Sequence, residues 1–110
     1  MHSVFIKDEY AEILSTMGDL QANIDVALQR YAIETITQKI NELRQKDESY
    51  TAKYSLSYPD FAEKTAADLD FVNHVESSID KTWEVDLADW EFCHKGIEDW
   101  MQTLKTILLA

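Results

Sequence analysis

Three histidines and one cysteine are the residues of this chain that most often bind metals or act as nucleophiles: His2, His74, His94 and Cys93. Cys93 and His94 are adjacent, so on a helix their side chains point about 100° apart and do not readily bind one ion. No Cys-x-x-Cys or His-x-x-x-His spacing is present. Cys93 also lacks a base at helical spacing that could activate a thiolate. The sequence therefore predicts no metal, no cofactor and no catalytic residue, and thus a protein that is not an enzyme.

Carboxylates dominate the charged residues, with 21 Asp and Glu against 10 Lys and Arg and a formal net charge of -11. Such a charge repels phosphate backbones and anionic lipid surfaces. From residue 68 to residue 99, ten acidic and two basic residues are interleaved with large aromatic side chains. An acidic surface with aromatic anchors suits a basic protein partner. We therefore expect partner contacts at Trp100, Phe92, Asp86 and Asp89.

A second interpretation of the same segment stays open. Trp83, Trp90, Ile97 and Leu104 recur every seven residues, which is typical of a buried seam along one helix. On this interpretation the tryptophans of the seam belong to a core, and the carboxylates form its solvated opposite face. This is the favoured interpretation for Trp83, Trp90 and Ile97, whereas Trp100 lies off the seam and is the better candidate for a partner contact.

The composition predicts which elements position these residues. Two Gly and one Pro in 110 residues argue against an all-β fold, which needs frequent turns, and predict a mainly α protein. A single cysteine excludes an intramolecular disulfide and fits a reducing compartment. No apolar run is long enough to span a membrane. We therefore expect a soluble, cytoplasmic protein without membrane contact.

Local signals place the first elements of the chain. Residues 3–7 are β-branched and aromatic and predict the only strand. Residues 8–17 then carry one helical apolar stripe, which Asp8 can cap and Gly18 can end. Asp19 is placed to cap the longer helix that follows.

The later elements are helical as well. The apolar stripe of the long helix continues to about residue 46. Ser57 begins another helical stretch, interrupted near residues 66–68, because Ser, Pro and Asp follow one another there as in a capping box. The chain closes with the helix that carries the seam and tolerates Gly96 at a cost of about 1 kcal/mol.

A strand, a short helix, a glycine turn and a long helix in this order resemble the ribbon–helix–helix fold. The run Ala22 to Tyr31 reads Ala-Asn-Ile-Asp-Val-Ala-Leu-Gln-Arg-Tyr. It is similar to the Ala-x-Ile-x-x-Ala-Leu-x-x-Tyr pattern that opens the second helix of small repressors and antitoxins of this family. The resemblance covers about residues 3–46 and implies a homodimer in which two copies pair their single strands.

The resemblance also implies where DNA would bind. In β-ribbon readers, alternate strand residues face the core and the others enter the major groove. If Val4 and Ile6 face inward, the period of two leaves Ser3, Phe5 and Lys7 as candidate DNA contacts. We expect any DNA binding to be weak, because the chain as a whole is acidic.

These observations divide the chain into a ribbon–helix–helix-like dimerisation region, residues 1–46, and an acidic helical extension, residues 47–110, that binds a partner. Many antitoxins of this family carry an extension that wraps and blocks a toxin. The resemblance therefore implies an antitoxin-like, transcription-regulating homodimer with a basic toxin protein as its partner. The alternative is a structural or adaptor helical module that binds another protein and never touches DNA.

Overall fold

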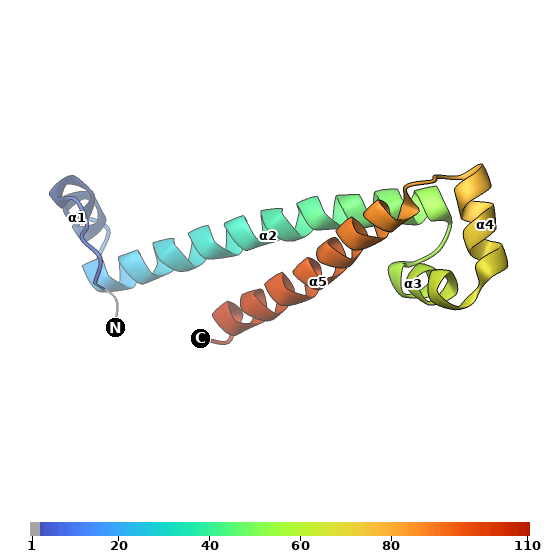
Figure 1. Ribbon diagram of the computed structural model, residues 1–110. Helices are drawn as coiled ribbons and strands as arrows, with labels where there is room; N and C mark the ends of the chain where they lie inside the picture. Colours follow the sequence, from blue (N-terminus) through green and yellow to red (C-terminus); the bar gives the residue numbers. More distant parts are fainter. Residues whose placement is uncertain (1–2) are drawn as a thin grey trace. The chain divides into compact units, whose positions relative to one another are not determined.

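The computed structural model describes residues 3–110 and confirms a mainly α protein. The described chain is 82% helical and forms five helices, shown in Figure 1. They are α1 (Asp8–Ser15), α2 (Leu20–Tyr54), α3 (Tyr58–Ala67), α4 (Leu69–Ser78) and α5 (Trp83–Leu108). No helix between residues 3 and 110 is long and apolar enough to cross a bilayer.

The helices belong to two compact units. The first unit ends at Thr35 and the second unit is Ile36–Ala110. The long helix α2 passes from the first unit into the second, so the boundary predicted after residue 46 lies inside this helix.

The prediction of a strand at residues 3–7 is wrong, and the ribbon–helix–helix resemblance that depended on this strand is therefore not supported. Between Ser3 and Ala110 no strand is present, and residues 3–7 have no regular secondary structure. Val4 is 83% exposed and Phe5 98% exposed. A lone strand has no neighbour for its backbone N–H and C=O groups, so β-branched composition alone does not make one. A fold defined by a paired strand is therefore not supported.

The helical turn of the first unit follows the sequence signals closely. Gly18 takes a positive φ of 124°, which ends α1 as predicted. Asp19 caps α2 by accepting a hydrogen bond from the backbone N–H of Ala22 at 2.9 Å. Asn23 donates its side-chain N–H to the carbonyl of Leu14 at 2.9 Å and so ties α2 to α1. Asp8 is not the cap of α1; it lies in the first turn, where a negative charge complements the helix dipole.

Helix α2 continues beyond residue 46, because its last turns carry side chains that face α5. Asp47, Tyr50 and Tyr54 recur at spacings of three and four residues, so they share one face of the helix. Ser55, with a positive φ of 59°, ends the helix. Ser57 then caps α3 through the backbone N–H of Asp60, as the sequence predicts.

The break predicted near residues 66–68 is confirmed. Asp68 separates α3 from α4 and caps α4 by accepting a hydrogen bond from the N–H of Phe71 at 3.1 Å. Helix α5 remains unbroken at Gly96. A methyl group added at Gly96 would lie 2.9 Å from the Cδ1 atom of Leu43, so the missing side chain lets α5 lie close to α2.

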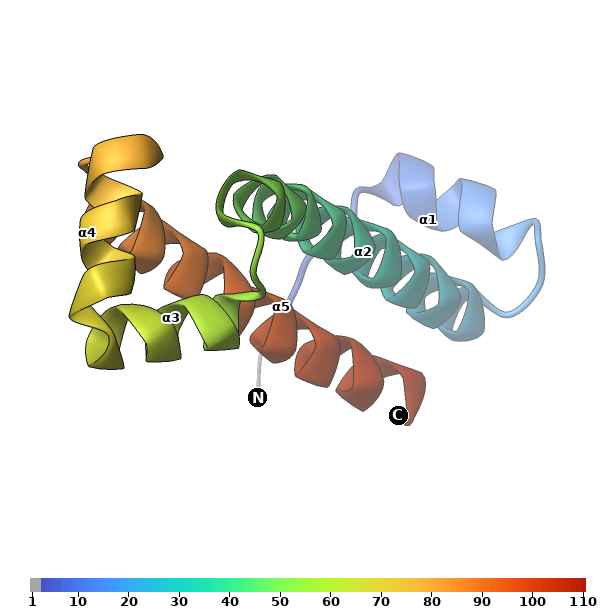
Figure 2. The same cartoon turned by 90° about the vertical axis from the view of Figure 1, so that its right-hand side faces the viewer.

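The second unit holds the core of the protein. Helix α5 runs back along the second half of α2, and α3 and α4 form a corner at one end of this pair (Figure 2). The buried cluster draws on all four elements and comprises Tyr54, Phe61, Val75, Trp83 and Trp90. The interpretation of Trp83 and Trp90 as core residues is therefore confirmed.

Candidate functional site

The three candidate DNA contacts lie on the segment that precedes α1. Ser3 and Phe5 are exposed and belong to the unpaired chain. Lys7 is the N-cap residue of α1, and its carbonyl accepts hydrogen bonds from the N–H groups of Tyr10 at 3.0 Å and Ala11 at 3.1 Å. The geometry that pointed these residues toward a major groove was that of a paired ribbon, which the described chain does not form. A contact of these residues with DNA stays a prediction.

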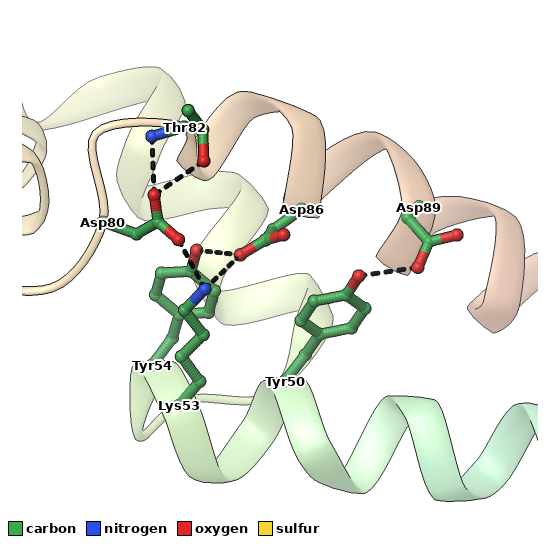
Figure 3. Close-up of polar contacts among 7 residues, drawn as sticks. All are labelled: Tyr50, Lys53, Tyr54, Asp80, Thr82, Asp86 and Asp89. Atoms are coloured by element: carbon green, nitrogen blue, oxygen red, sulfur yellow. Dashed lines mark hydrogen bonds and ion pairs between the residues drawn. The ribbon is translucent and has the colours of Figure 1, made fainter.

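Asp86, a predicted partner contact, faces α2 (Figure 3). Its Oδ2 atom accepts hydrogen bonds from the Tyr54 hydroxyl at 2.6 Å and from the Lys53 ammonium at 2.7 Å. The same ammonium bonds to Asp80 at 2.6 Å. Asp80 in turn accepts two hydrogen bonds of 2.7 Å from the backbone N–H and the hydroxyl of Thr82. Lys53 therefore links the end of α2 to the start of α5.

Asp89, another predicted partner contact, lies one turn further along the same face of α5. It accepts a hydrogen bond from the Tyr50 hydroxyl at 2.6 Å, and Lys46 lies 3.7 Å away on its other oxygen. Next to it the indole N–H of Trp90 donates to Asp47 at 2.7 Å. Asp86 and Asp89 thus both accept hydrogen bonds from side chains of α2. Whether they also meet a partner stays a prediction.

We call the residues that join these helices the helix clasp; its members are Tyr50, Lys53, Tyr54, Asp80, Thr82, Asp86 and Asp89 (Figure 3). The predicted long helix ends at about residue 46, so the clasp residues Tyr50, Lys53 and Tyr54 were not placed on it from the sequence. The signal was available in the i, i+4 spacing of Tyr50 and Tyr54 and the i, i+3 spacing of Asp86 and Asp89.

The clasp changes the protonation behaviour of its members. The Lys53 ammonium, followed by the donors of Thr82, holds the pKa of the Asp80 carboxyl well below its usual range. The same ion pair, together with Asp86, raises the pKa of Lys53. The hydrogen bond to Asp89 raises the pKa of Tyr50, and burial, followed by the bond to Asp86, raises the pKa of Tyr54. In each case these surroundings favour the protonation state present near neutral pH.

We expect the clasp to weaken in alkali. A tyrosine whose folded pKa exceeds its unfolded value of about 10 contributes stability that is complete below that pH and is lost as the pH rises toward the folded pKa. Replacing Tyr50→Phe and Tyr54→Phe together should lower the free energy of unfolding by about 1–3 kcal/mol at neutral pH. It should also flatten the fall in stability above about pH 10. Urea unfolding at a series of pH values measures both effects.

Lys53 is present in both proteins, so its own titration does not account for a difference between them. Tyr10→Phe, at a position 56% exposed in the first unit, is the matched control and should change neither quantity. Parallel pH profiles for the wild type and the double variant would contradict a role of the tyrosine hydroxyls.

The other two predicted partner residues lie on different faces of α5. Phe92 is 69% exposed. Trp100 is half-buried, and the Nζ atom of Lys39 lies 5.5 Å from its ring centroid, so the indole lies against α2. Trp100 thus lies on the α2 side together with Asp86 and Asp89, whereas the Phe92 side chain is exposed. Three of the four predicted residues therefore contact α2, and only Phe92 leaves most of its side chain free.

Phe92 belongs to an exposed apolar stripe along α5. Val85, Ala88 and Phe92 follow at spacings of three and four residues, and Val85 is also 69% exposed. A shallow hollow of about 420 Å³ lies on this side of the helix. It is lined by Ala88, Glu91, Phe92, Lys95, Gly96 and Asp99. We call this stripe with its charged border the α5 outer face.

The cysteine and the histidines, which were considered as metal ligands or nucleophiles, have other surroundings in the described chain. Cys93 is fully buried, and burial raises the pKa of its thiol. His94 stacks on the Tyr58 ring at 4.8 Å between centroids and lies 3.5 Å from Glu98. Within residues 3–110 no three His, Cys, Asp or Glu side chains gather into a potential metal site. His2 lies outside the described residues.

Comparison of the chain with protein-family models, curated proteins and solved structures gave no match.

Proposed function

We propose that the protein is a non-enzymatic, helical interaction module that binds a basic protein segment through the α5 outer face. The observation that carries this proposal is the exposure of Phe92 on a helix whose other large aromatic residues, Trp83, Trp90 and Trp100, are buried or half-buried. Aromatic side chains, Phe among them, are enriched at the centres of protein interfaces and often anchor them.

The apolar part of the face has the shape of a helix-binding stripe. Val85, Ala88 and Phe92 span two turns along one line of α5. Such a line accepts the apolar side of an amphipathic helix, whose anchors recur with the same period. The four-element core beneath keeps the helix rigid, so little ordering free energy is lost when a partner binds.

The charged border of the face supports a basic partner. Glu84, Glu91 and Asp99 are exposed around the stripe. Lys95, the basic residue among those that line the hollow, lies 3.2 Å from Glu91, so these two charges offset one another and Glu84 and Asp99 supply the negative surplus of the border. The chain as a whole carries a net charge of -11, which would attract a basic partner from a distance.

An antitoxin-like role is one specific form of this proposal, and it depends on charge alone, because the ribbon–helix–helix resemblance that implied it is not supported. A toxin that binds nucleic acid must itself present a basic surface, and an acidic module that covers this surface would inhibit it. DNA binding forms no part of the proposal, because Ser3, Phe5 and Lys7 were selected on the basis of a paired strand. A transcription-regulating role is left out for the same reason.

Photo-crosslinking in the native host tests the proposal. A photoreactive phenylalanine analogue in place of Phe92 should crosslink to a basic protein, whereas the same analogue in place of Leu109, which is 76% exposed at the end of the chain, should not. Capture of the same proteins at both positions, or of acidic proteins alone, would contradict the proposal.

The affinity of the captured partner provides the quantitative prediction. Phe92→Ala should weaken binding by roughly thirtyfold, the effect of losing an interface anchor of about 2 kcal/mol. Raising the salt concentration from about 0.05 to about 0.5 M should slow association, because the carboxylates are exposed and screened. Fluorescence anisotropy of the labelled partner measures both effects. Leu109→Ala is the matched control, and equal losses for the two variants would refute the assignment of the face.

A further inference from the structure

The first unit exposes the largest share of apolar side chains in the protein. None of the residues from 3 to 35 is buried; the first buried side chain along the chain is Ile36. Nine of the sixteen exposed large apolar side chains lie between Val4 and Tyr31. A unit of fewer than about 40 residues rarely gains enough burial to be stable by itself and commonly depends on oligomerisation. A surface that covers these side chains would therefore stabilise the unit.

A groove collects much of this apolar surface. It has a volume of about 340 Å³ and is lined by Leu14, Met17, Asn23, Val26, Ala27, Arg30, Tyr31 and Glu34. Tyr10 and Ile13 extend the same stripe of α1 away from the groove and are 56% and 55% exposed. The groove and the stripe form one continuous apolar face.

The charges in the groove indicate what covers it. Among its lining residues only Arg30 and Glu34 are charged, and they have opposite signs one helical turn apart. An acidic partner would attract Arg30 and repel Glu34, and a basic partner would do the reverse. A second copy of the same chain, turned about a two-fold axis so that the two α2 helices run antiparallel, would place Arg30 of each copy beside Glu34 of the other.

We propose that this groove is the interface between two copies of the chain, which form a symmetric dimer through α1 and the first half of α2. The pairing buries Met17, Val26 and Tyr31 of both copies and forms the Arg30–Glu34 ion pair twice. The proposal does not depend on the α5 outer face, because the two surfaces share no residue. A homodimer is also expected from the sequence, but one held together by paired strands. The dimer proposed here is held together by helices instead.

Charge exchange across the interface tests the proposal with the full-length chain. Sedimentation analysis at micromolar concentration should show a dimer for the wild type. Arg30→Glu and Glu34→Arg should each raise the dimer dissociation constant tenfold or more, because each places like charges opposite one another. A one-to-one mixture of the two variants should restore dimers, since every ion pair is then formed between opposite charges.

Two further variants complete the test. Lys81→Glu changes the net charge by the same amount as Arg30→Glu, but in the exposed turn before α5. It should leave the dimer dissociation constant unchanged. Met17→Ser trims the groove without changing its charge and should raise the constant, so the proposal remains testable if a charge variant loses helix by circular dichroism. A monomeric wild type, a dimer insensitive to the groove variants, or a mixture that stays monomeric would each overturn the proposal.

Discussion

Replacing Trp90→Ala is expected to lower the free energy of unfolding of the second unit by about 3–5 kcal/mol, the range for truncating a large core aromatic residue. Trp90 is completely buried. Its ring lies 5.5 to 6.0 Å from the ring centroids of four neighbours, Tyr50, Tyr54, Tyr58 and Phe61. A small domain has a total stability of about 5–15 kcal/mol, so this loss would remove a large share of the stability of the unit.

A second substitution at the same position separates packing from hydrogen bonding. Trp90→Phe keeps most of the ring packing but removes the indole N–H that donates to Asp47 at 2.7 Å. We expect it to cost about 1–3 kcal/mol, less than the alanine variant. Urea unfolding followed by circular dichroism measures both losses. Phe92→Ala, two residues further along, should stay within about 0.5 kcal/mol of the wild type, and an equal loss at the two positions would contradict the described core.

Placing a carboxylate at position 75 is expected to be the most damaging single change in the second unit. Val75 is completely buried in α4 and belongs to the same cluster as Phe61 and Trp83. Val75→Asp would bury a charge without a partner, which should cost more than about 4 kcal/mol. Thermal unfolding should then show the cooperative transition greatly lowered or absent.

The matched control is the same substitution on α5. Val85 is 69% exposed, so Val85→Asp should change the melting temperature little. It should nevertheless perturb binding of a partner at the α5 outer face, because it lies in the apolar stripe. Similar melting temperatures for the two variants would be inconsistent with the burial of α4.

The sequence by itself determined the features that depend on neighbouring residues. Gly18, Asp19 and Ser57 act within one or two turns, and each ends or caps a helix as predicted. The seven-residue repeat that carries Trp83 and Trp90 identified two core residues, because a periodic apolar face must be buried wherever the helix packs.

Only the tertiary structure decided the features that depend on distant residues. Asp86 and Asp89 bond to tyrosines that lie 32 and 39 positions earlier in the chain, and no local pattern pairs residues across such a distance. The failure at residues 3–7 has the same origin, because a strand exists only through hydrogen bonds to a neighbouring strand and composition does not supply that neighbour. Helix periodicity and capping are local properties of a sequence, whereas the partner of a carboxylate or of a strand is decided by how the chain folds back on itself.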